Sequence, residues 1–461
     1  MYNSNRKSGY DWIIIGIYIS LLIIGWFAIY AATYSYNVEV DFLDASVPIT
    51  KQSIYVVVAV SVFLSSLYIN SKFWHTFAYI FYGIGIFLLF LVLIFGSEIK
   101  GAKAWFVFGG FSFQPAEIAK FGTALALSSF LSYFKVNLKT TSYLWISVFI
   151  IFTPIFFILL QPDAGSALTF FSFFILLFIE GFSPLFYLAF ILCIIVFITT
   201  FIFPLIFVIF SLLVLAIIFS WFYFKSFKFQ WPLLIISVIT ILTVFILYNQ
   251  ILGLSLAIGA LLLSLILLWK GRQEKLVFIM PIGIIGLCLF AISSIKLFEG
   301  LEAHQQERIK VWLKPEECDP RGSLYNVLQS KVAIGSGGFF GRGFMNGNMT
   351  KLKFVPEQST DFIFSTIGEE QGFVGSSIVI LLYILLIWRI LQRSEQESNK
   401  FISHFGICLA GLIFIHVLIN IGMTLGLMPI IGIPLPFISK GGSSLIGFSL
   451  MLGVFIRMQT K

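Results

Sequence analysis

The sequence predicts an all-α integral membrane protein, a polytopic helical bundle of about 14 transmembrane helices with one large extracytoplasmic loop. Three observations predict this class. The mean hydropathy is +1.01. Only 11% of the residues are charged, whereas soluble domains carry roughly 25%. Apolar runs of about twenty residues, each long enough to cross the hydrocarbon core of a bilayer, recur along the chain.

The first candidate span, 12–32, is too long for the apolar part of a cleavable signal peptide. Several of the junctions between 184 and 269 are very short. In chain order the spans are 12–32, 53–70, 76–96, 115–134, 143–160, 165–182, 184–203, 204–224, 232–249, 250–269, 276–297, 372–391, 403–426 and 437–457.

Lysine and arginine gather in alternate connections when the N-terminus, with Arg6 and Lys7, is placed in the cytoplasm. The opposite connections include the acidic segment 39–44, the turn at 161–163 and the loop 298–361. This distribution follows the positive-inside rule and predicts that both termini are cytoplasmic. It also explains the net charge of +8, so nucleic-acid binding is not needed to account for that charge.

Cysteine and histidine do not indicate a disulfide framework or a zinc site. Three of the four cysteines lie in apolar runs, and Cys318 is alone on the outer side, which is unlike a disulfide-rich secreted chain. The histidines show no ligand spacing; they are His75, His304, His404 and His416. No metal site is therefore predicted.

The outer loop 298–361 is the most informative part of the chain, because it is rich in charge, glycine and polar residues in an otherwise apolar sequence. Long loops are usually functional or disordered. This one contains apolar residues that can pack, among them Trp312, Tyr325 and Phe339. We therefore expect a folded loop that takes part in chemistry.

Further polar motifs also fall on the predicted outer side, several of them where glycine or proline enters a helix. Irregular backbone at membrane depth is tolerated only where it is buried in protein or lines a cavity. The motifs therefore predict one outward-facing cavity roofed by the loop. They are GAKAWF at 101–106, QPAEIAK at 114–120, QPDAGS at 161–166, TDFIFSTIGEEQG at 360–372 and PLPFISKGGSSL at 434–445.

Two glycine-rich runs, GSGGFFGRG at 335–343 and SKGGSSL at 439–445, contain no Walker pattern. A glycine-rich match alone is a weak signal. Glycine here either permits close packing of the loop on the helices or lets backbone N–H groups approach an anion.

Three charged residues in these motifs each allow two interpretations. Glu117 and Lys120 lie three residues apart and share a helix face, so they either form a structural pair, or Lys120 offers its charge to an anionic head group. Asp163 follows Pro162 and either caps a helix through free backbone N–H groups or contributes to the cavity.

Asp319 in the outer loop also allows two interpretations. Asp-Pro followed by Gly322 builds a tight turn, which is the simpler explanation. A carboxylate in a loop folded over a cavity also suits a general base. Cations flank it, and they could stabilise a pyrophosphate leaving group; they are Arg308, Lys310, Lys314 and Arg321.

Taken together, the motifs resemble the SEDS family of bacterial cell-wall polymerases, the RodA/FtsW group. The similarity covers most of residues 1–182 and 277–461. It is carried by WFVFGGFSFQPAEIAK, QPDAGSAL, QERIKVWLKPEECDPRGSLYNVLQSKVAIGSGGFFGRGF, VPEQSTDFIFSTIGEEQGFVG and PLPFISKGGSSL. The resemblance implies that the family's essential loop aspartate is Asp319. It places the cavity residues at Trp105, Gln114, Glu117, Lys120, Asp163 and Arg308.

The chain departs from the family in two respects. It carries about 90 more residues than short members, enough for about four helices of roughly twenty residues beyond the family's ten. The predicted parts are an N-terminal membrane core (1–182), inserted transmembrane helices (183–276) and a C-terminal membrane core (277–461). The C-terminal motif has Lys440 where the family often has tyrosine; Lys440 and Ser443 are further substrate-binding candidates.

The resemblance implies a peptidoglycan glycosyltransferase for cell-wall elongation and cell shape, closest to the RodA branch. It would polymerise lipid II at the outer face of the bacterial cytoplasmic (inner) membrane, with inversion and release of undecaprenyl pyrophosphate. Asp319 would be the base, with Arg308 and Lys120 on the diphosphate. The expected partners are the lipid-linked glycan, membrane lipids and a class B penicillin-binding transpeptidase. No cofactor is evident, and a divalent cation, although chemically compatible, has no ligand cluster to support it.

Three alternatives remain open: a lipid II flippase or other transporter, an FtsW-type division polymerase, and a non-catalytic scaffold for a transpeptidase. Transporters place charge at the bilayer midplane and often show inverted repeats, whereas the polar motifs here lie outward and no repeat is visible. A scaffold would need no catalytic carboxylate.

Overall fold

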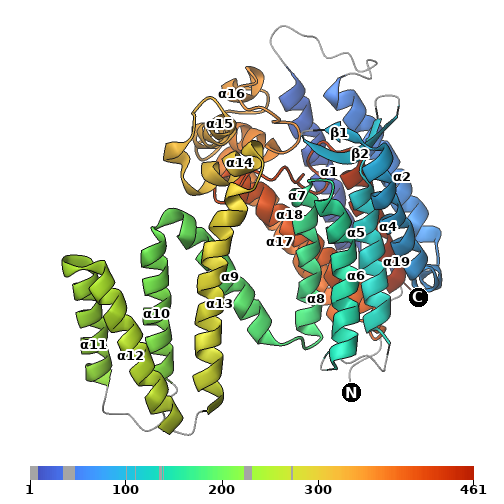
Figure 1. The fold of residues 1–461 in the computed structure, drawn as a ribbon. Helices are drawn as coiled ribbons and strands as arrows, with labels where there is room; N and C mark the ends of the chain where they lie inside the picture. The colour runs from blue at the N-terminus through green and yellow to red at the C-terminus, as the bar shows by residue number, and fades with distance from the viewer. Residues whose placement is uncertain are drawn as a thin grey trace. The chain divides into compact units, whose positions relative to one another are not determined.

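The computed structural model describes residues 9–34, 47–99, 101–108, 111–133, 138, 140–222, 231–270 and 274–460 (Figure 1). The chain forms two compact units. The first unit comprises Met1–Phe182 and Asp319–Lys461, and the second comprises Ser183–Cys318. The three-part division at 182 and 276 stays a prediction.

The described residues of the first unit form nine apolar helical segments, each of which falls on one of the predicted spans. They are α1 (Trp12–Thr33), α2 (Pro48–Tyr68), α4 (Ala78–Phe95), α5 (Pro115–Leu131), α6 (Thr141–Leu159), the continuous run α7 (Ala164–Thr169), η1 (Phe170–Phe173) and α8 (Phe174–Ile179), α17 (Ile363–Glu395), α18 (Lys400–Thr424) and α19 (Gly442–Gln459). A short helix, α3 (Ser71–Thr76), connects α2 and α4.

The second unit contains the remaining predicted spans. They correspond to α9 (Pro184–Ile202), α10 (Leu205–Phe222), α11 (Trp231–Thr243) with the π-helical η2 (Val244–Tyr248), α12 (Gln250–Lys270) and α13 (Glu274–Glu299). Among the described residues, nine helices of the two units are long and apolar enough to cross a membrane, and four further apolar helices are shorter. This polytopic helical architecture confirms the predicted fold class.

The outer loop is folded, as its apolar content led us to expect. In the second unit it forms α14 (Ala303–Leu313) and the short η3 (Pro315–Glu317). In the first unit it forms α15 (Ser323–Ser336) and α16 (Asn348–Lys351). The loop therefore has secondary structure of its own.

A small antiparallel sheet between α4 and α5 was not predicted. It consists of β1 (Ser97–Ile99), β2 (Ala102–Phe108) and β3 (Phe111–Phe113). In register, Ser97 pairs with Trp105 and Phe106 pairs with Phe113. The GAKAWF motif thus lies on a β-strand, and β3 delivers the chain directly to Gln114 at the start of α5.

Helices α2 and α19 run parallel and pack through small residues. A Cβ atom on Gly442 would lie 2.5 Å from the ring of Tyr55, in the N-terminal half of α2, and one on Gly453 would collide with Ser66 near the C-terminal end of α2. Asp11 caps α1 and pairs with Arg389 (2.9 Å) and Arg393 near the C-terminal end of α17. These contacts fix the two ends of the bundle.

Much of the predicted charge asymmetry lies outside the described residues. The cations concerned are Arg6, Lys7, Lys135, Lys139, Lys225, Lys228, Arg272 and Lys461, and the acidic residues are Glu39, Asp41 and Asp44. The topology with cytoplasmic termini therefore stays a prediction.

Candidate functional site

A polar cluster joins three of the predicted motifs in the first unit. Gln114, the residue before Pro115 of α5, donates from Nε2 to Asp163 Oδ2 (2.9 Å) and to Ser166 Oγ (3.0 Å). The backbone N–H of Gln114 donates to Ser443 Oγ (3.0 Å) at the start of α19. The structure therefore brings the QP, QPDAGS and SKGGSS motifs together. That they line an outward-facing cavity stays a prediction.

Asp163 is the N-cap of α7, as one of the two interpretations proposed. Its Oδ1 accepts from the Ser166 N–H (2.9 Å), and its Oδ2 accepts from Ser166 Oγ (2.7 Å) and from Gln114. Three hydrogen bonds therefore hold this carboxylate in one orientation. The carboxylate thus caps the helix and also organises the cluster, so the two interpretations are compatible.

Glu117 and Lys120 form a buried ion pair, with Nζ 2.8 Å from Oε1 and exposed side-chain fractions of 3% and 2%. The Lys120 ammonium also donates to Nε2 of His416 on α18 (3.1 Å) and lies over the ring of Phe448 on α19. Because an ammonium can only donate, His416 Nε2 is the acceptor, and its Nδ1–H donates to the Leu412 carbonyl (2.8 Å).

This enclosed arrangement favours the structural interpretation of the pair. The ammonium is directed to partners on α5, α18 and α19 rather than to an open surface. Among the described residues, Glu117 Oε2 is buried without a partner. A contact between Lys120 and a substrate would require this packing to open.

Asp319 is exposed and forms a turn. Its Oδ1 accepts from the backbone N–H of Arg321 (2.9 Å), and its carbonyl accepts from the N–H of Gly322 (3.1 Å). The predicted Asp-Pro turn is therefore present. Within the turn, a backbone N–H donates to Oδ1, and the carboxylate remains exposed to solvent.

The remaining site candidates are Trp105, Arg308 and Lys440. Trp105 is half-buried on β2, and Arg308 is half-buried on α14 of the second unit. Lys440 precedes α19 and is half-buried, and its N–H donates to the Ser359 carbonyl (2.9 Å). Burial, together with the charge of Lys51, lowers the pKa of the Lys440 ammonium, while Glu357 acts in the opposite direction.

The segment before α19 is irregular backbone held deep in the first unit. Asn420 on α18 donates to the carbonyls of Asp361 (3.0 Å) and Ile433 (2.7 Å), and Ser439 donates to the Thr360 carbonyl (2.7 Å). These hydrogen bonds hold the TDF and PLPFIS motifs together. Such backbone is tolerated in a membrane bundle because its polar groups are satisfied by protein.

Glu369 on α17 anchors the outer loop, which the sequence did not indicate. It is fully buried. Its carboxylate accepts from the N–H groups of Met349 (2.8 Å) and Thr350 (2.9 Å) and from the Thr350 hydroxyl (2.7 Å). These three hydrogen bonds fix α16 on α17.

The first glycine-rich run packs against a kink in α17. Gly372 has φ 66°, a conformation that favours glycine. The N–H of Gly343 donates to the Glu370 carbonyl (2.9 Å), and a Cβ on Gly341 would collide with that carbonyl. This confirms the interpretation that glycine permits close packing of the loop on the helices.

Among the residues that the structure describes, no group of three or more His, Cys, Asp or Glu side chains could hold a metal ion. The donor set therefore assigns no residues to a metal, and we derive no chemical step through one.

The family of this chain follows from comparison with known proteins. The family described as a cell cycle protein, comprising FtsW, RodA and SpoVE, matches residues 11–225 and 206–461. The chain belongs to this family. The resemblance to the RodA/FtsW group that the motifs indicated is thereby confirmed.

Similar proteins extend over nearly the whole chain. The peptidoglycan glycosyltransferase RodA of Treponema pallidum is 31% identical over 98% of this chain and 98% of its own length. The peptidoglycan glycosyltransferase MrdB of Escherichia coli K12 is 30% identical over 84% of this chain and 78% of its own.

A solved structure described as "Structural coordination of polymerization and crosslinking by a peptidoglycan synthase complex" has a TM-score of 0.61 to this chain. It covers 98% of each chain at 24% identity. At that identity the likeness supports the fold of this chain and nothing further.

Proposed function

We propose that this protein is a peptidoglycan glycosyltransferase that polymerises lipid II for cell-wall elongation. The observation that carries the proposal is the meeting of Gln114, Asp163 and Ser443 in one polar cluster in a chain similar throughout to relatives named for that activity. A cluster of convergent polar groups at the ends of membrane helices suits the polar head group of a lipid.

In the proposed reaction Asp319 acts as the general base. It accepts the proton of the acceptor sugar's 4-hydroxyl while that oxygen forms a bond to the anomeric carbon of the lipid-linked donor. The bond from that carbon to the pyrophosphate oxygen breaks, the configuration inverts, and undecaprenyl pyrophosphate leaves. The carboxylate of Asp319 is exposed and therefore accessible for this role, and among the described residues its Oδ1 accepts from the backbone N–H of Arg321.

Cations stabilise the leaving diphosphate by charge-assisted hydrogen bonds. We assign this role to Lys440, which is half-buried in the first unit. Arg308, half-buried on α14 of the second unit, stays a prediction from the sequence. Lys120 was predicted for the same role, but its ammonium is enclosed by Glu117 and His416. We therefore propose that Lys120 positions α5 against α18, and retain direct diphosphate binding as the alternative.

We place the protein in the bacterial cytoplasmic membrane with the polar cluster outward, and propose a class B penicillin-binding transpeptidase as its partner. The charge asymmetry of the sequence supports the orientation. A similar structure is described as a complex that coordinates polymerization and crosslinking, which supports a partner of this kind.

The proposal is tested with the purified full-length chain reconstituted with the transpeptidase and supplied with lipid II. Glycan polymer should accumulate and undecaprenyl pyrophosphate should be released. Transfer of lipid II between the leaflets of a vesicle without polymer would support the flippase, and no change in lipid II would support the scaffold. Rescue of a strain depleted of its elongation polymerase, and not of its division polymerase, would separate the RodA-type role from the FtsW-type role.

A further inference from the structure

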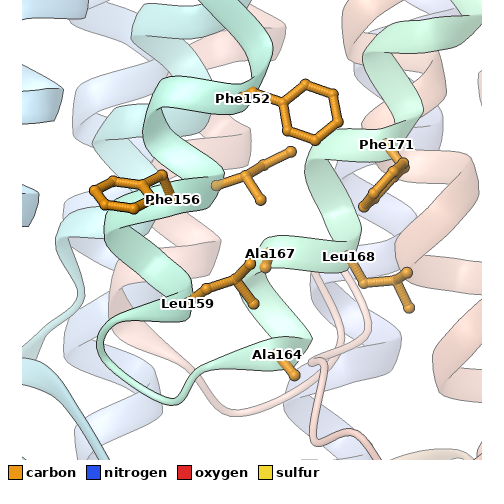
Figure 2. Close-up of a pocket in the computed structure, with 8 residues that line it drawn as sticks. Phe152, Phe156, Leu159, Ala164, Ala167, Leu168 and Phe171 are labelled. Atoms are coloured by element: carbon orange, nitrogen blue, oxygen red, sulfur yellow. The ribbon is translucent and has the colours of Figure 1, made fainter. Parts of the chain in front are cut away.

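An apolar groove lies beside the polar cluster in the first unit. It has a volume of about 430 Å³, within the range of about 300–1,000 Å³ typical of ligand pockets. Helix α6 contributes Phe152, Phe156 and Leu159 to one wall, and α7 with η1 contributes Ala164, Leu168 and Phe171 to the other. Figure 2 shows Phe152 and Leu159 directed from α6 toward α7 and η1, whereas the ring of Phe156 is directed to the other side of α6.

The groove opens on the face of the bundle that lipid would cover. Phe156 and Leu159 are 60% and 55% exposed, whereas Ile155 and Ala167 at its floor are buried. The rings of Phe152 and Phe171 meet edge to face, with centroids 6.2 Å apart, at the end farther from the 160–163 turn. From Leu159 to Phe152 the groove follows α6 for about 10 Å.

The groove and the polar cluster share the first turn of α7. Asp163 and Ser166 lie on the face that bonds Gln114. Ala164 and Leu168 lie on the face that lines the groove. Because residues three and four apart share a helix face, a head group held by the cluster has the groove directly beside it, leading from the outer turn toward the membrane.

We propose that this groove, between α6 and α7–η1, receives the first units of the polyprenyl chain of the lipid-linked substrate. The inference rests on the proposed function, because that function supplies a substrate with a polar head and an isoprenoid chain. The lining is wholly apolar and therefore suits the chain, while the adjoining carboxylate, amide and hydroxyl suit the head. A bilayer phospholipid is the competing occupant.

The test uses direct labelling and does not require catalysis. The full-length chain, in nanodiscs of phosphatidylglycerol and phosphatidylethanolamine, carries the photoreactive residue p-benzoylphenylalanine in place of Leu159, with radiolabelled undecaprenyl pyrophosphate as probe. Ala189 on lipid-exposed α9 is the control position. Labelling at 159 should exceed that at 189 several-fold, and excess unlabelled undecaprenyl pyrophosphate should abolish it.

Equal labelling at both positions, or labelling at 159 that unlabelled undecaprenyl pyrophosphate does not displace, would overturn the inference and indicate bulk lipid only. A second variant, Ala164→Trp, fills the groove from an exposed position and should remove the labelling at 159. It should also raise the KM for lipid II several-fold without changing the KM for a short-chain analogue, whereas Ala189→Trp should change neither.

The outcomes separate this inference from the proposed function. Specific labelling in a protein that makes no polymer would leave the groove assignment standing and contradict the polymerase. Polymerisation with no specific labelling, and with an unchanged KM in Ala164→Trp, would contradict the groove alone.

Discussion

The two compact units of this protein bury their polar side chains in different ways. In the second unit, all four buried polar side chains among the described residues are hydroxyls that donate to a carbonyl of their own helix; they are Thr200, Ser220, Ser264 and Ser294. In the first unit, some buried hydroxyls do the same, as Ser66 and Ser394 show. Other buried polar side chains of that unit bond between helices, as Lys120 does with His416 and Tyr18 does with Ser449.

This difference indicates where the chemistry belongs. A hydroxyl bonded within its own helix is satisfied wherever the helix lies, so it does not select one packing. A bond between helices fixes their separation and orients the groups that it joins. The second unit packs through apolar contacts, such as the stacked rings of Phe210 and Phe245. The first unit is therefore the part that holds a site in a defined geometry.

The largest expected effect is on the buried ion pair. Lys120→Met leaves the Glu117 carboxylate buried without its cation, which typically costs about 3–5 kcal/mol. We expect loss of monodisperse protein on size-exclusion chromatography in detergent. The double variant Glu117→Leu/Lys120→Met removes both charges and should recover most of the folded protein.

The double variant also decides the role of Lys120. If the folded double variant polymerises lipid II at the wild-type rate, Lys120 does not bind the diphosphate, and the role of the buried pair is to fix the packing of the first unit. If it folds but is inactive, the ammonium takes part in the reaction. Recovery of neither fold nor activity would contradict the assignment of the pair to packing.

The polar cluster should respond next. Asp163→Asn keeps a good N-cap but loses acceptor capacity toward Gln114 and Ser166. Hydrogen bonds to charged groups contribute about 1.5–3 kcal/mol, so polymerisation should fall roughly 10- to 100-fold. Initial rates of glycan formation measure this. The exchange Gln114→Glu/Asp163→Asn restores a donor–acceptor pair, and failure to regain any activity would show that charge at 163, and not the cluster, is required.

A smaller effect separates two buried serines. Ser443→Ala leaves the Gln114 N–H without its acceptor, at a cost of about 1–3 kcal/mol. Ser264→Ala removes only a bond within α12 and should stay within about 0.5 kcal/mol. Thermal inactivation of the two purified variants gives the comparison, and equal losses would contradict the distinction between the units.

The smallest effect concerns pH. The pKa of Lys440 lies below its ordinary value of 10.5 because of burial and the charge of Lys51. The folded state thus favours the neutral amine, so rising pH stabilises the fold, while anion binding by the ammonium weakens as the pH passes the folded-state pKa. Lys440→Arg should retain polymerisation to a higher alkaline pH than the wild type. Superimposable pH profiles would remove Lys440 from the site.

The sequence predicted the membrane helices well because hydrophobic length is a local property. Every predicted span falls on a helical segment, even between 184 and 269, where the junctions are short. The sheet at 97–113 was missed because its strands are short and aromatic. Gly101, at φ +82°, was the available sign of a turn between β1 and β2.

The site could be predicted only in part. Gln114, Asp163 and Ser443 belong to polar motifs that the sequence singled out, and hydrogen bonds join them in the structure. His416 was missed because a single histidine in an apolar run gives no sign of a partner 296 residues away. Glu369 was missed because the groups that donate to its carboxylate lie in α16, a single helical turn that no hydrophobic periodicity indicates. Contacts between distant segments depend on the fold and are not encoded locally.

The central claim, that Asp319 is the base of a lipid II polymerase, is tested most directly by Asp319→Asn. Asparagine can still accept the Arg321 N–H and keep the turn. General base catalysis contributes about 10²–10⁴-fold, so the purified variant with its partner should lose at least about 100-fold in polymerisation. The exposed Glu316→Gln in the same loop should stay within about twofold. Near-wild-type polymer from Asp319→Asn would contradict the account.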